Sequence, residues 1–194
     1  LADFVVDFHS GGKTLDFLPF CCAHVLNDKE QQSRCIDAMK AFNAPHSVML
    51  LEIDAVNMYD TAAENMGKVF ISTELGGGGS TTAYTVEIAK KGIRNLLRHA
   101  GICKGDLEIS ETLNLDMPDR RCYIFSETTG LVEHCVDLGD SVKEGQLIAK
   151  VHNIERTGVA PVEYFAGIDG IYTGRHYPGL VVNGDFLGVV AVPV

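Results

Sequence analysis

Two short apolar runs, each ending in a chemically active side chain and followed by glycines, constrain this chain most. Residues 4–8 are apolar apart from one aspartate, and His9 and a glycine pair follow them. Residues 68–74 end in Glu74, and a run of four glycines comes shortly after. Apolar runs of this length predict buried strands of a parallel sheet. Ligands bind at the carboxyl ends of such strands, so His9 and Glu74 are candidates for a metal ligand and a general base.

The first half of the chain alternates strand-like and helix-like patterns. Beyond the two strands above, we expect an extended segment over 15–22, a helix over 28–42, a strand over 48–53 and a helix over 82–100. Asn27 with Glu30 resembles a capping box at the start of the first helix, and Gly101 can cap the end of the second. This rhythm predicts an α/β domain over 1–104, with a mostly parallel sheet and flanking helices.

The second half has short strands separated by glycine turns. We expect strands over 130–135, 146–151, 170–173 and 186–190. Regular short strands indicate a small β-barrel over 105–194, which resembles the biotinyl/lipoyl-like fold. A carrier domain of that type would present a lysine between its two halves, and residues 153–158 contain none. We therefore expect a structural or lid role for this domain.

Charge, hydropathy and cysteine spacing limit the classes of function. The net charge of −10 argues against a nucleic-acid binder, which would carry a basic face. No apolar run is long enough to cross a membrane, and no signal peptide opens the chain. The six cysteines form no CxxC pair, which favours buried reduced thiols in a cytoplasmic protein and makes a cysteine metal site improbable. A homo-oligomer is left open.

The whole chain resembles the distal part of the succinylglutamate desuccinylase/aspartoacylase family, which are zinc amidohydrolases related to zinc carboxypeptidases. The motifs that carry the resemblance are residues 7–12 (DFHSGG), 73–79 (TELGGGG) and 175–181 (RHYPGLV). Within the family, residues 13–16 and 41–45 look most like the deacetylases of ectoine breakdown, which act on N-acetyl-2,4-diaminobutyrate.

The resemblance implies that His9 is the third zinc ligand and Glu74 the catalytic carboxylate. Asp7 shares the strand face of His9, so it either orients the imidazole or belongs to a buried polar network. The family takes its other two ligands from an HxxE motif before this strand. The chain has one such motif, from His152 to Glu155, and it lies after the strand. We interpret it as chance, because strand alternation separates the two side chains.

Only a few residues precede the first expected strand in the given sequence, and the sequence has no initial methionine. We therefore expect that an N-terminal part is missing, together with two zinc ligands and the arginine that binds the substrate carboxylate in the family. The chain alone is then expected to be inactive and to hold no tight zinc.

Other candidate residues have less specific signals. The glycines at 76–79 could cradle a phosphate before the second helix, but they lack the P-loop ending. We expect Gly76 and Gly77 to leave room for the backbone beside the substrate. Arg175 and Tyr177 either overhang the substrate or have ordinary surface roles. The remaining histidines are expected at the surface or at caps: His24, His46, His99, His134 and His176.

These patterns lead to one main expectation and one alternative. The main expectation is a zinc-dependent hydrolase that cleaves an N-acyl amide, with acetyl as the acyl group, of a small amino acid such as N-acetyl-diaminobutyrate. The alternative is a non-enzymatic α/β-plus-barrel module for assembly or small-molecule binding.

Overall fold

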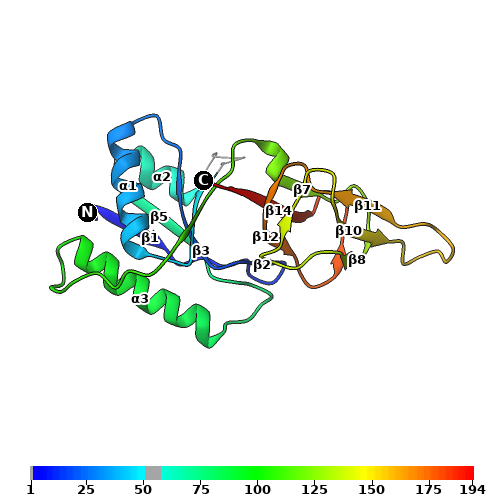
Figure 1. Cartoon of the computed structure of the whole chain (residues 1–194), viewed down its shortest axis with the longest axis horizontal. Coiled ribbons are helices and arrows are strands. Elements are labelled where there is room, and N and C mark those ends of the chain that lie inside the picture. Colours follow the sequence, from blue (N-terminus) through cyan, green and yellow to red (C-terminus); the bar gives the residue numbers. More distant parts are fainter. Residues whose placement is uncertain (1, 51–57) are drawn as a thin grey trace. The chain divides into compact units, whose positions relative to one another are not determined.

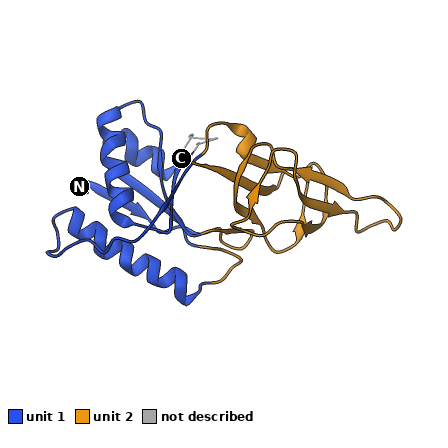
Figure 2. Cartoon of the chain, viewed as in Figure 1, with its two compact units in different colours: residues 1–10, 19–75, 81–116 blue, residues 11–18, 76–80, 117–194 orange. Residues whose placement is uncertain are grey.

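The computed structural model describes residues 2–50 and 58–194. It divides into two compact units (Figures 1 and 2). Unit 1 takes residues 1–10, 19–75 and 81–116, and unit 2 takes 11–18, 76–80 and 117–194. Two loops of the first half, 11–18 and 76–80, therefore belong to unit 2. We expected one domain over 1–104 and another over 105–194, and this division into domains stays a prediction.

Unit 1 is a mixed sheet with three helices. Its strands are β1 (Phe4–Asp7), β3 (Phe20–His24), β4 (His46–Leu50), β5 (Val69–Glu74) and β6 (Leu113–Asp116). Its helices are α1 (Lys29–Phe42), α2 (Tyr59–Asn65) and α3 (Ala83–His99). The strand order is β1-β5-β3-β4-β6. The expected strand over 48–53 is β4 as far as Leu50, and its last three residues lie outside the described part.

The expectation of a mostly parallel sheet is not confirmed for the chain. Within unit 1, β1–β5, β3–β4 and β4–β6 are parallel, whereas β3–β5 is antiparallel. A parallel neighbour needs a long crossover, usually a helix. No helix lies between β1 and β3, so the chain reverses direction between these two strands. Because β5 runs parallel to β1, β3 is antiparallel to β5.

An apolar core in unit 1 joins α1 and α3 to the sheet (Figure 1). Its fully buried members include Cys21, Cys35, Ala38 and Phe42. The helix ends are set locally. Asp28 caps α1 by accepting the backbone N–H groups of residues 30 and 31, so the predicted cap one residue earlier is wrong.

The second long helix, α3, has the predicted ends. Thr82 and Thr85 form a capping box at its start. Gly101 adopts a φ of 73° just beyond its end and donates its N–H to the carbonyl of Arg98. A residue with a Cβ is strained at such a positive φ, which is why glycine terminates the helix well.

Unit 2 is antiparallel throughout its described strand pairs. One group of strands is β14 (Phe186–Pro193), β12 (Gly170–His176) and β2 (Leu15–Phe17), with β7 (Tyr123–Phe125) on β14 and β9 (Ser141–Val142) on β12. The other is β11 (Val162–Phe165), β10 (Leu147–His152), β8 (Gly130–His134) and β13 (Leu180–Val181). A short 3₁₀ turn, η1 (Arg120–Cys122), precedes β7.

The predicted order, an α/β part followed by an all-β part, is confirmed, but a closed barrel is not. Within residues 117–194, all of which are described, β11 pairs only with β10 and β13 only with β8. The sheet thus keeps two edges. A separate core holds the unit together around the fully buried Tyr172, Ile148 and Leu187.

The structure bears on the expectations of buried thiols and of no membrane-spanning segment. All six cysteines are free; four are buried, whereas Cys103 and Cys135 are exposed. The expectation of buried thiols is therefore right for four and wrong for two. Among the described helices, none combines the length and the apolar character needed to cross a membrane.

Candidate metal and acid–base site at the strand ends

The backbone brings His9 and Glu74 together at one end of the unit 1 sheet. Strands β1 and β5 run parallel, and Asp7 lies opposite Ser72. Beyond the strand, the N–H of Leu75 donates to the carbonyl of His9 at 3.0 Å. This bond continues the same register, which sets residue 74 beside residue 9. The chemical roles of the two side chains stay predictions.

Asp7 lies beside the His9 imidazole. Its Oδ2 is 3.6 Å from Nδ1 of His9, and the two side chains are 39% and 59% exposed. This separation is that of an ion pair and is too long for a hydrogen bond. Asp7 is therefore placed where it can orient the ring, and the ring remains open to solvent.

Glu74 is the carboxyl group of unit 1 whose pKa is raised most among the described residues. Its Oε2 is buried and has no hydrogen-bond partner among the described residues. Burial, followed by the negative charge of Asp7, raises the pKa of Glu74 to about 8. Desolvation and a like charge both disfavour the ionised form. The carboxyl therefore holds its proton at neutral pH, and a nearby positive charge would release that proton.

Thr73 was missed by the sequence analysis. It is fully buried, and its hydroxyl accepts the backbone N–H of His9 at 3.0 Å. The only available signal was a threonine directly before Glu74. A threonine inside an apolar run is typical of any strand, because β-branched residues favour extended backbone.

The glycine loops serve close backbone packing within unit 2. A Cβ on Gly77 would lie 2.0 Å from the carbonyl oxygen of Leu15, and one on Gly11 would lie 2.4 Å from the same atom. Gly11 also donates its N–H to the carbonyl of Gly76 at 2.9 Å. The space left by Gly77 is thus occupied by the chain itself. A role beside substrate for Gly76 and Gly77 stays a prediction.

Arg175 and Tyr177 lie at the end of β12 in unit 2. Arg175 reaches Oδ2 of Asp16 at 3.2 Å and Oδ1 of Asp137 at 3.6 Å. The Tyr177 ring would contact a Cβ on Gly78 at 3.4 Å, and Tyr177 is 40% exposed. The contacts with Asp16 and Asp137 are structural contacts of Arg175. A place near the substrate for Arg175 or Tyr177 stays a prediction.

Two of the remaining histidines are not surface residues. His24 is buried, with Nδ1 2.9 Å from Oε1 of Glu64. His176 is also buried, and its ring nitrogens lie near two backbone carbonyls. No local pattern indicates this burial, because Glu64 is 40 residues away from His24. The surface prediction is wrong for these two.

The downstream HxxE motif does not form a pair. Nε2 of His152 lies 2.6 Å from Oε2 of Glu133, a residue of the neighbouring strand β8. The backbone N–H of Glu155 instead bonds the side chain of Asn153. Both observations agree with the interpretation of the motif as chance.

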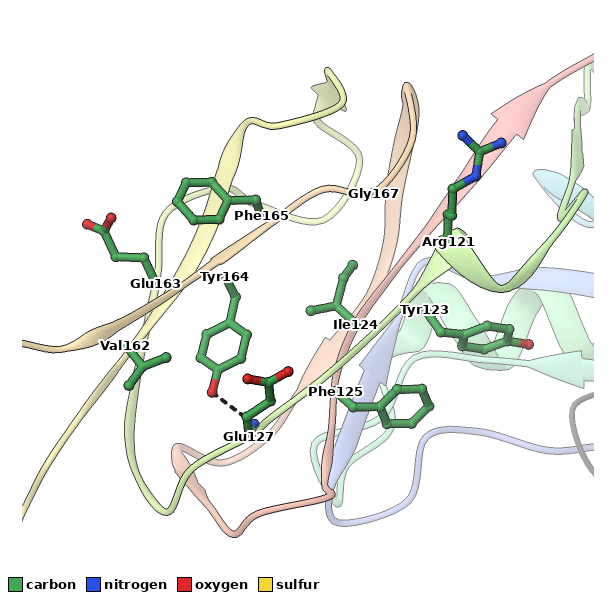
Figure 3. A pocket seen from close by; sticks show the side chains of 10 residues that line it. All are labelled: Arg121, Tyr123, Ile124, Phe125, Glu127, Val162, Glu163, Tyr164, Phe165 and Gly167. Carbon is green, nitrogen blue, oxygen red and sulfur yellow. Dashed lines mark hydrogen bonds between the residues drawn. The ribbon is translucent and has the colours of Figure 1, made fainter.

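A separate pocket in unit 2 lies between β7 and β11 (Figure 3). Phe125 and Phe165 line it, and the hydroxyl of Tyr164 accepts the backbone N–H of Glu127 at 2.9 Å. None of the predicted site residues lines this pocket. It therefore gives no support to the predicted chemistry.

The described residues fit part of a zinc site. A zinc-binding histidine usually donates its second ring N–H to a carboxylate, and Asp7 lies near Nδ1 of His9 but beyond hydrogen-bond distance, at 3.6 Å. No group of three His, Cys, Asp or Glu side chains in the described ranges could hold a metal ion. A catalytic zinc needs three protein ligands. A metal-ligand role for His9 and an acid–base role for Glu74 therefore stay predictions.

Comparisons with known proteins agree with the motifs. The sequence profile of the succinylglutamate desuccinylase/aspartoacylase catalytic domain matches residues 1–100. The N-alpha-acetyl-L-2,4-diaminobutyric acid deacetylase of Halomonas elongata is 49% identical over 193 residues, 98% of this chain and 56% of that protein.

Solved structures give the same picture. The product-bound ectoine utilization protein EutE (DoeB) from Ruegeria pomeroyi has a TM-score of 0.96 and 59% identity, over 98% of this chain and 58% of that chain. A succinylglutamate desuccinylase from Silicibacter sp. TM1040 has a TM-score of 0.93 and 56% identity, over 100% of this chain and 59% of that chain. The chain thus spans a little over half the length of these relatives.

Proposed function

Because this chain belongs to the succinylglutamate desuccinylase/aspartoacylase family, we propose that it is the distal part of the catalytic domain, followed by the β domain, of a zinc-dependent deacylase. The proposed reaction is hydrolysis of the acetyl amide of a small amino acid, with N-acetyl-2,4-diaminobutyrate as substrate. The name and the 49% identity of the Halomonas elongata relative support this choice. The proposed location is the cytoplasm, where thiols stay reduced.

One observation carries the proposal: at the strand end next to His9, Glu74 has a buried carboxyl oxygen that no described residue hydrogen-bonds, and the charge of Asp7 acts on it. Such a group costs stability. Strongly shifted pKa values cluster at functional sites, where the shift adapts the group to acid–base chemistry. A carboxyl that only supported the fold would be expected to have hydrogen-bond partners.

His9 would hold the zinc, with Asp7 orienting its ring. When bound, zinc supplies a Lewis acid and a water whose pKa is lowered towards 7. With a cation bound nearby, the pKa of Glu74 would fall from about 8, so that its carboxylate would be available. Glu74 then takes the proton of the attacking water and later delivers it to the nitrogen of the leaving amine.

The test is an assay of the natural-length protein against acetyl and succinyl amides of diaminobutyrate and other small amino acids. We expect fastest turnover of the acetyl amide of diaminobutyrate, loss of turnover after chelator dialysis, and recovery with zinc. If zinc-loaded protein hydrolyses none of these amides, the deacylase proposal is wrong and the non-enzymatic module is favoured.

A further inference from the structure

The feature that carries a further inference is the buried hydroxyl of Thr73, on β5 next to Glu74. Thr73 is 0% exposed, and its Oγ1 contacts three backbone atoms of the opposite strand end. It lies 3.0 Å from N of His9, 3.1 Å from O of His9 and 3.4 Å from O of Asp7. One side chain thus contacts the backbone of both residues placed at the predicted zinc position.

The donor and acceptor roles of the Thr73 hydroxyl follow from its hydrogen bonds. A hydroxyl has one proton to donate and two lone pairs to accept with. It accepts the N–H of His9 and gives its proton to one carbonyl, and the carbonyl of His9 is the nearer. The carbonyl of His9 also accepts the N–H of Leu75. Both polar backbone atoms of His9 are therefore bound to β5 or to the residue that follows it.

The location of this contact matters because β1 ends at Asp7. Past that residue, the N–H of His9 bonds a side-chain oxygen and no longer a ladder carbonyl. A β-branched side chain has few accessible χ1 rotamers, so the hydroxyl is held in place before any ligand binds. The backbone of His9 is thereby ordered, although its side chain is 59% exposed.

We propose that Thr73 is a positioning residue: its hydroxyl sets the backbone of His9 and so directs the imidazole towards the metal. The expected effect of Thr73 on catalysis rests on the proposed function. The hydrogen bond between Thr73 and the backbone of His9 does not. Groups that hold a metal ligand in place typically change metal affinity or activity by 10- to 100-fold when they are removed. Thr73 acts through the backbone, so we expect the lower end of that range.

The test compares Thr73→Val, which keeps the shape but removes the hydroxyl, with Thr73→Ser, which keeps the hydroxyl. In the natural-length protein, Thr73→Val should lower zinc affinity, measured by chelator competition, about tenfold. It should lower kcat more than it raises KM, because His9 contacts the metal and not the substrate. Thr73→Ser should keep wild-type zinc affinity.

The matched control is Thr173→Val in unit 2. Thr173 is also buried on a strand, and its hydroxyl contacts one backbone carbonyl at 3.4 Å. We expect this variant to change the unfolding midpoint but not zinc affinity. A folded Thr73→Val protein with wild-type zinc affinity would overturn the proposal, as would an equal loss in Thr73→Ser.

A second measurement requires no active enzyme and no variant. The amide of His9 should exchange with solvent at least ten times more slowly than that of Gly12, an exposed residue three positions further on. Equal exchange rates would refute the hydrogen bond on which the inference depends. If the protein hydrolyses no amide, the proposed function fails, while zinc affinity and amide exchange still decide the role of Thr73.

Discussion

Two histidines among the described residues of unit 1 lie near carboxylates, with opposite properties. His24 and Glu64 are both buried, and their side chains meet at 2.9 Å. His9 is largely exposed, and Glu74 near it keeps a buried oxygen without a partner among the described residues. The first group has the contacts expected of a structural pair, and the second lacks them.

The surroundings of the two groups explain the difference. Helix α2 supplies Glu64, and Gln31 of α1 donates to the carbonyl of Glu64 at 2.8 Å. His24 also stacks on Phe70, with ring centroids 6.4 Å apart. Among the described residues, Oε2 of Glu74 has no hydrogen-bond partner. The comparison teaches that residue types alone do not separate a structural pair from a candidate site; hydrogen bonding and burial also have to be known.

The largest expected effect is on catalysis at Glu74. Glu74→Gln should lower deacylation by about 10³-fold, because acid–base groups contribute roughly 10²- to 10⁴-fold. The variant should fold, since an amide keeps the shape of the protonated carboxyl and carries no charge. Steady-state kinetics on the natural-length protein measure the loss. Glu155→Gln, the same change on an exposed loop, is the control, and equal activity in both variants would remove Glu74 from the mechanism.

The structural pair should show the converse behaviour. Glu64→Ala leaves His24 buried without its carboxylate, and breaking a buried pair costs about 3 kcal/mol or more. The free energy of unfolding, from urea titration, measures it. Glu163→Ala removes half of a more exposed pair with Lys150 at 3.5 Å, which should cost at most about 1 kcal/mol. Similar losses in both would show that the His24–Glu64 pair is not a structural centre.

The pH dependence of stability sharpens the contrast. Because the folded pKa of Glu74 is raised from 4.5 to about 8, the folded metal-free chain binds this proton more tightly than the unfolded chain. The stabilisation is complete below pH 4.5 and is lost progressively up to pH 8. Glu74→Gln should therefore gain stability relative to wild type as the pH rises through that window. A pH-independent difference would mean that Glu74 has an ordinary pKa.

The smallest expected effect concerns zinc in the chain of 194 residues by itself. We expect no equimolar zinc after dialysis against micromolar zinc, because His9 supplies one ligand and a stable catalytic site needs three. Atomic absorption on the dialysed protein measures the content. One zinc per chain that disappears in His9→Ala would contradict this expectation.

Local sequence was enough to predict several parts of the fold. Apolar runs and glycines predicted β1, β5 and the ends of α3, because strand burial and helix capping depend on neighbouring residues. The placement of His9 and Glu74 at the ends of strands also followed from local pattern. Their adjacency required only that the two strands be neighbours, which the register of β1 and β5 shows.

Only the tertiary structure decided the remainder, because the decisive contacts join residues far apart in the chain. The hydroxyl of Thr73 meets the backbone of His9 across 64 residues, and Glu64 meets His24 across 40. The raised pKa of Glu74 likewise depends on burial and on Asp7 from another strand. Desolvation and partner geometry are properties of packed neighbours, so no local pattern could indicate which carboxyl has hydrogen-bond partners and which has a buried oxygen without one among the described residues.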